Sequence, residues 1–145
     1  MTAPVDPSVP PPEFVASRRF RYASAGCLGA VILAASVTKP DDSVRWTLFG
    51  VNSTVYLHLL AYAGFAGTIG YALGSTDRLA LFIAIAVSTL YGGGIELLQS
   101  AIPYRTMALW DALVNAFGAT IGAILWELIA PWFDVADGKS KERAK

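Results

Sequence analysis

The chain has 145 residues, enough for one domain; 54% of them are hydrophobic, only 15% are charged, and the mean hydropathy is +0.50. This composition is too apolar and too poor in charge for an ordinary soluble domain, and it indicates an integral membrane protein. The formal net charge is zero, and the sequence carries no phosphate-binding loop, dinucleotide fingerprint or paired-cysteine zinc site, so neither a nucleic-acid partner nor a cofactor is expected.

The first hydrophobic segment follows a long N-terminal tail. Residues 1–17 hold five prolines among small and polar residues, so we expect a disordered tail there. Three arginines then precede an uncharged run over residues 22–38, which is just long enough to cross the hydrocarbon core. A cleavable signal peptide is the alternative, but the run is longer than a usual signal core and the preceding tail is unusually long. We therefore favour a retained first span.

Three further spans are predicted, at about residues 54–73, 79–99 and 108–132. The second is dense in small residues, which let membrane helices approach closely. Residues 134–145 form a charged C-terminal tail. The predicted fold is therefore an all-α, polytopic membrane protein with four transmembrane helices, formed by residues 18–133.

Basic residues choose the orientation of these spans. Eight lie on the side of the two termini, against three on the other side: Lys39, Arg45 and Arg105. Because Lys and Arg favour cytoplasmic segments, we expect a multi-pass protein of the cell membrane with both termini cytoplasmic. Trp46 and Trp110 at the outer ends, with Trp126 and Trp132 at the inner end, fit interfacial aromatic belts.

Costly polar residues gather at the outer ends of the last two spans. On a helix Glu96 and Gln99 share one face, with Gly92 one turn earlier. The next span carries a stripe about 60° wide, made of Asp111, Asn115, Gly118 and Gly122. A short loop with Arg105 joins the two spans and forces an antiparallel hairpin. Two acids, one arginine and two amides should therefore converge at the outer membrane face.

These residues resemble the signature of the VanZ-like family of small membrane proteins. The resemblance rests on Glu96-x-x-Gln99, on Pro103-x-Arg105, on the stripe from Asp111 to Gly122, and on His58 with Tyr62 four residues later. One departure is that Thr54 and Val55 stand where the family often has an Asp-Lys pair, which puts any role of that pair in doubt. The family takes its name from a member linked to glycopeptide antibiotic resistance, so the resemblance implies the cell envelope and supplies a site more than a reaction.

The candidate roles follow from residue chemistry. Glu96, Asp111 and His58 are the candidate catalytic residues, because carboxyls buried in a membrane protein can act as general acid or base and an intramembrane His is rarely without a task. Arg105 can hold a phosphate or carboxylate in a forked geometry. The other candidate ligand-binding residues are Gln99, Asn115 and Tyr62. Gly118 and Gly122 are assigned to helix packing.

Each role has a structural alternative. His58 can form an interhelical hydrogen bond, and Arg105 can neutralise one acid while Gln99 and Asn115 bond the other, clamping the third span to the fourth. Three consecutive glycines, beginning at Gly92, indicate either a close helix contact or a local break beside Glu96.

A metal site could draw three ligands from His58, Glu96 and Asp111, but the spacing does not demand a metal, and none is assigned.

Two functions remain open from the sequence. In the favoured one, an outward-facing polar pocket binds or modifies the headgroup of an envelope lipid or a lipid-linked precursor, so the partners are membrane lipids. In the other, the chain is a non-enzymatic structural or interaction protein whose polar cluster latches helices together. A proton or ion pathway is poorly supported, because the fourth span below Asn115 is apolar down to Trp126 except for Thr120.

Overall fold

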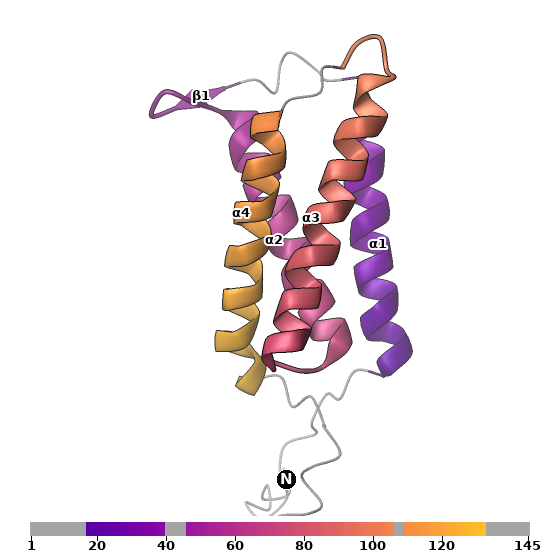
Figure 1. Cartoon of the computed structure of the whole chain (residues 1–145), viewed down its shortest axis with the longest axis vertical. Helices are drawn as coiled ribbons and strands as arrows, with labels where there is room; N and C mark the ends of the chain where they lie inside the picture. The colour runs from indigo at the N-terminus through magenta and orange to yellow at the C-terminus, as the bar shows by residue number, and fades with distance from the viewer. Residues whose placement is uncertain (1–16, 40–45, 106–108, 133–145) are drawn as a thin grey trace, which may run out of the picture.

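Four long antiparallel helices make up the molecule, which we describe from a computed structural model (Figure 1). The structure describes residues 17–39, 46–105 and 109–132, so the two predicted tails lie almost wholly outside the described residues. The helices are α1 (Arg18–Val37), α2 (Ser53–Leu73), α3 (Arg78–Ser100) and α4 (Leu109–Ile129), which continues into the 3-10 helix η2 (Ala130–Trp132). The prediction of an all-helical fold is therefore confirmed.

Local sequence signals set several helix ends. The Ser17 side chain accepts a hydrogen bond from the backbone N–H of Phe20, and the Asp77 side chain accepts one from Ala80 at 2.8 Å. Both residues act as N-caps, because they satisfy amide donors that have no partner within the helix. Helix α2 ends at Gly74, whose φ of 68° is the left-handed conformation that glycine adopts most readily. A tight connection therefore follows, and α3 turns back along α2.

A small β-hairpin was not foreseen by the sequence analysis. Strands β1 (Thr47–Leu48) and β2 (Val51–Asn52) pair antiparallel just before α2, at the end of the bundle that also holds the α3–α4 loop (Figure 1). Phe49 and Gly50 form the turn, with φ of 50° and 78°. Positive φ at both central residues is the geometry that matches the twist of a two-residue hairpin. The uncharged stretch that begins at Trp46 therefore forms first this hairpin and then helix α2.

Helix α2 lies at the centre of the packing and contacts each of the other three helices. Against α4 the backbones come very close: a methyl group at Gly118 would lie 2.6 Å from the carbonyl oxygen of Leu59, and one at Gly122 would overlap the carbonyl of Ala63. At the other end of the same interface Trp126 covers Gly70, and its indole N–H donates to the carbonyl of Ser75 at 3.0 Å. Small residues on α2 and α4 thus let the two helices approach to backbone contact.

The position of Trp126 corrects the prediction of an inner aromatic belt. Its side chain is only 3% exposed, because it packs inside the bundle over Gly70. Trp132, in contrast, is 84% exposed, and Trp46 and Trp110 are exposed at the opposite end. A tryptophan close to the end of a predicted span can thus serve helix packing instead of the interface.

Three helical segments among the described residues are long and apolar enough to cross a membrane: Arg18–Val37, Arg78–Ser100 and Trp110–Trp132. Helix α2 has a comparable length of 21 residues but is not among them. Its sequence includes His58 and three tyrosines, which lower its average hydropathy. Helix α2, which contacts each of the other three helices, therefore carries several polar side chains within a largely apolar sequence.

Candidate functional site

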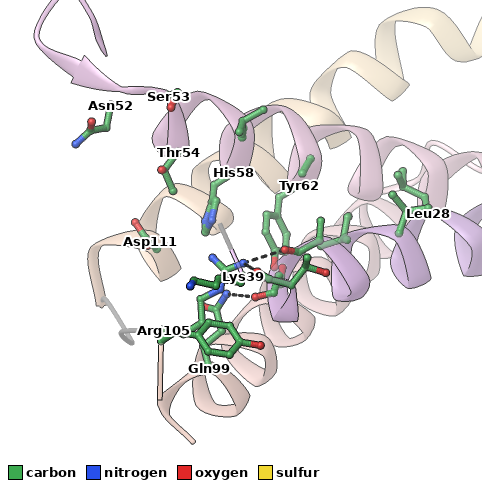
Figure 2. Close-up of a pocket in the computed structure, with 18 residues that line it drawn as sticks. Leu28, Lys39, Asn52, Ser53, Thr54, His58, Tyr62, Gln99, Arg105 and Asp111 are labelled. Carbon is green, nitrogen blue, oxygen red and sulfur yellow. Dashed lines mark hydrogen bonds between the residues drawn. The ribbon is translucent and has the colours of Figure 1, made fainter. Parts of the chain in front are cut away.

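A cavity of about 870 Å³ opens at the end of the bundle near the hairpin and the α3–α4 loop. Its wall changes character along its length. Leu28, Val31 and Ile32 of α1 contribute an apolar part, and Leu28 lies at the end of the cavity far from Asp111 (Figure 2). The polar part is lined by Lys39, His58, Tyr62, Gln99, Arg105 and Asp111. Most of the predicted site residues therefore border one amphipathic cavity.

The three predicted catalytic candidates come together from three different helices. His58 lies in the second turn of α2, Glu96 in the last turns of α3, and Asp111 in the first turn of α4. One ligand-capable atom of each side chain lies within 4.8 Å of those of the other two. Glu96 is 4% exposed, whereas His58 and Asp111 are half-buried and face the cavity. The predicted convergence of polar groups is therefore real in three dimensions.

Asn115 orients His58. The Nδ1 atom of His58 lies 3.0 Å from the Oδ1 atom of Asn115, which is 1% exposed. A carbonyl oxygen can only accept, so Nδ1–H is the donor of this bond, and in the neutral imidazole the lone pair then lies on Nε2. The amide was expected either to bind a ligand or to bond an acid, and its oxygen instead fixes the tautomer of the imidazole.

The cavity wall beside α1 is held by side chains that reach carbonyls at the end of that helix. Gln99 donates to Ser36 at 2.9 Å and Tyr104 to Val37 at 2.9 Å. The Nη2 group of Arg105 donates to Ala35 at 3.0 Å and also to Thr38. These acceptors are the last carbonyls of α1, which have no partner within the helix. A cationic donor there also complements the negative end of the helix dipole.

This arrangement differs from the latch considered in the sequence analysis. That latch paired Arg105 with an acid and joined α3 to α4, whereas Arg105 and Gln99 bond main-chain carbonyls and join the α3 end to α1. The link between α2 and α4 is made instead by His58 and Asn115. The polar residues do connect helices, but in a different pattern from the predicted one.

Of the two interpretations of the three consecutive glycines, the structure supports a close helix contact and not a local break. Helix α3 runs without interruption through Gly92, Gly93 and Gly94, so no local break lies beside Glu96. A methyl group at Gly92 would lie 2.8 Å from the ring of Tyr62 and 2.9 Å from Nδ2 of Asn115, whereas Gly93 and Gly94 have open space. Gly92 therefore makes room for the two buried side chains that back the site.

Among the cavity residues that the sequence analysis did not assign to the site, Lys39 and Tyr104 carry polar groups. Lys39 directly follows α1 and is exposed beside the cavity, and Tyr104 precedes Arg105 in the α3–α4 loop. In the sequence, Lys39 stood out only as one of the few outer basic residues. The polar loop around it did not indicate that its side chain would lie beside the site. Tyr104 offered no signal beyond its neighbour.

Comparison with known proteins supports the resemblance noted in the sequence. A family model described as VanZ/LLP1 matches residues 27–130, which include the C-terminal half of α1 and the whole of α2, α3 and α4. No curated protein and no solved structure matched the chain.

Proposed function

The chain belongs to the VanZ/LLP1 family of membrane proteins, and from its cavity we propose that it binds an amphipathic lipid of the cell envelope. In this proposal α2 is a fourth transmembrane span, both termini are cytoplasmic, and the cavity opens at the outer leaflet. The excess of basic residues on the side of the termini supports this orientation.

The carrying observation is the change in polarity along one continuous cavity. An apolar wall between α1 and α2, with Val31 and Leu57 both partly exposed, leads to a polar end bounded by Lys39, His58 and Asp111. A lipid has the same division, since its chain is apolar and its headgroup polar. The hydrocarbon chain of the lipid would lie along α1, and its headgroup would lie at the polar end of the cavity.

Charge indicates an anionic headgroup. Lys39 is exposed at the cavity, and Arg105, with one Nη group bonded to α1, still offers further N–H donors. Phosphate and carboxylate are the groups that such cations bind best. Glu96 and Asp111 would handle a proton or polar donors on the bound headgroup, with Gln99 and Asn115 positioning the groups around them.

A lipid-linked precursor of the envelope has the same chemistry as a phospholipid: a phosphate between a long chain and a polar head. Binding such a precursor would supply a chemical link to glycopeptide resistance, which the family name implies for one member. The retained molecule's mass distinguishes the two sources.

Native mass spectrometry of the purified protein in mild detergent tests this proposal. Lys39→Gln removes a charge from the cavity, and Arg78→Gln removes an exposed charge from the other end of the bundle. Val31→Trp fills the apolar wall, and Leu33→Trp adds the same bulk to another exposed position of α1. We expect an anionic lipid in the wild type and both controls, about fivefold weaker retention in Lys39→Gln, and loss in Val31→Trp. Equal retention by all five proteins would overturn the proposal.

A structural role is the second candidate, and the hydrogen bonds between helices favour it. Tyr91 donates to Gly29 at 2.6 Å, Gln99 to Ser36, and His58 bonds Asn115, so polar side chains join α1 to α3 and α2 to α4. Under this reading Lys39→Gln would change neither lipid retention nor stability, while removal of Gln99 would lower the melting temperature.

A further inference from the structure

His58, Glu96 and Asp111 form a cluster whose donor set is that of a metal site. Each comes from a different helix, so their approach to within 4.8 Å depends on the packing of α2, α3 and α4 together. An imidazole and two carboxylates can surround one ion from three sides. No stretch of sequence would produce this grouping by local spacing.

Electrostatics favours a cation at this position. Two carboxylates at such a distance repel one another when both are ionised, and the repulsion is strong where one of them, Glu96, is 4% exposed. Arg105, a cation on the same cavity, directs Nη2 to the carbonyls of α1. A divalent ion would stabilise both carboxylates at once.

The surroundings of His58 prepare it as a ligand. Its Nδ1–H donates to the buried oxygen of Asn115, so the neutral imidazole would offer the lone pair of Nε2 to an ion. Metal-bound histidines almost always donate their other ring N–H in this way. Asn115, like Tyr62, packs closely against Gly92, and its Nδ2 atom is buried without a hydrogen-bond partner among the residues that the structure describes. The buried side chain of Asn115 therefore lacks one of its hydrogen bonds, which costs free energy of folding. A function for His58 would explain why this cost is tolerated.

We propose that His58, Glu96 and Asp111 bind one divalent transition-metal ion, Zn²⁺ or Mn²⁺. A mixed set of one nitrogen and two oxygen donors suits these borderline ions better than Mg²⁺ or Ca²⁺, which prefer oxygen alone. Three protein ligands leave a coordination position open. His58 and Asp111 line the cavity, so the open position faces it and can take an anionic oxygen. The proposal goes beyond lipid binding and can be tested without any lipid.

The test uses the full-length protein without a histidine tag, freed of metal and titrated with ZnCl₂ or MnCl₂ in detergent by isothermal calorimetry. Glu96→Gln and Asp111→Asn each remove one charged ligand at nearly constant shape. Glu127→Gln is the matched control, because Glu127 is an exposed acid at the other end of α4. We expect one ion per chain and at least tenfold weaker binding in the two cluster variants, with the control unchanged.

A spectroscopic measurement on the wild type keeps the proposal testable if the variants do not fold. The chain has a single histidine, so a nitrogen coupling from imidazole in the pulsed electron paramagnetic resonance spectrum of bound Mn²⁺ can only come from His58. We expect that coupling, and its loss in His58→Phe. Absence of saturable binding, or binding without imidazole nitrogen, would overturn the proposal.

Discussion

The Nδ1 atom of His58 lies 3.0 Å from the Oδ1 atom of Asn115, and this contact joins α2 to α4 inside the bundle. It lies at the same end as Glu96 and Asp111, so one pair of side chains both connects two helices and sets the tautomer of the histidine. These residues therefore contribute both to the packing of the helices and to the chemistry of the site, and a substitution can affect both.

A double-mutant cycle with His58→Ala and Asn115→Ala should reveal this contact. His58→Ala leaves the buried amide oxygen of Asn115 without its partner, and Asn115→Ala leaves the half-buried imidazole without its acceptor, so we expect a loss of about 1–3 kcal/mol in the free energy of unfolding for the first and a smaller loss for the second. The double variant should lose less than the sum, by about 0.6–1.7 kcal/mol, which is the range for polar pairs between membrane helices. Unfolding in mixed detergent micelles, followed by circular dichroism, measures all four proteins. Strictly additive losses would contradict the contact.

Arg105→Ala should loosen the C-terminal end of α1. The guanidinium donates to the carbonyls of Ala35 and Thr38, and hydrogen bonds from a charged donor contribute about 1.5 kcal/mol or more. Hydrogen exchange should therefore become faster in the peptide covering residues 33–39. Arg78→Ala, at the other end of the bundle, is the control and should leave that peptide unchanged.

Arg105→Lys separates geometry from charge in the same experiment. Lysine keeps the positive charge near the negative end of the helix dipole but lacks the forked donors. Partial recovery of protection is expected. Exchange as fast as in Arg105→Ala would show that geometry alone matters, and wild-type protection in Arg105→Ala would contradict the capping role.

The sequence predicted the helices and the site members better than the bonds between them. Four helices could be located because long uncharged runs and tight turns are local features, and the meeting of Glu96 with Asp111 followed from a short loop between two helices. The partner of Arg105 could not be predicted, since the carbonyls of α1 lie about 70 residues away and carry no side-chain signal. The hairpin was missed for a related reason: Phe49 adopts a positive φ that its residue type rarely shows.

Gly92→Ala and Gly93→Ala should have opposite effects on stability. A methyl group at Gly92 would press on Tyr62 and Asn115, so we expect a loss of about 1–3 kcal/mol. At Gly93 there is open space, and alanine should stabilise the helix by about 0.5–1 kcal/mol. Melting temperatures in the same detergent check the pair. Similar shifts for both variants would mean that the helix does not pack on Tyr62 through Gly92.

Whether α2 crosses the membrane can be tested from its two ends. Its polar side chains do not argue against a span, because Tyr62 is 3% exposed and His58 faces the cavity, while Leu60 is exposed and apolar. A helix surrounded by others needs an apolar surface only on the side that meets lipid. We therefore expect the hairpin before α2 and the turn after it to lie on opposite sides of the membrane.

Cysteine labelling of spheroplasts measures this directly. The single native cysteine is first removed by Cys27→Ser, and Phe49→Cys or Thr76→Cys is then introduced at an exposed position before or after α2. A membrane-impermeant maleimide should label Phe49→Cys in intact spheroplasts and Thr76→Cys only after permeabilisation, because the excess of basic residues predicts cytoplasmic termini and, with them, a cytoplasmic α2–α3 turn. Labelling of both from outside would show that α2 does not span. The reverse pattern would show that it spans with the cavity facing the cytoplasm, which would move the bound lipid to the inner leaflet.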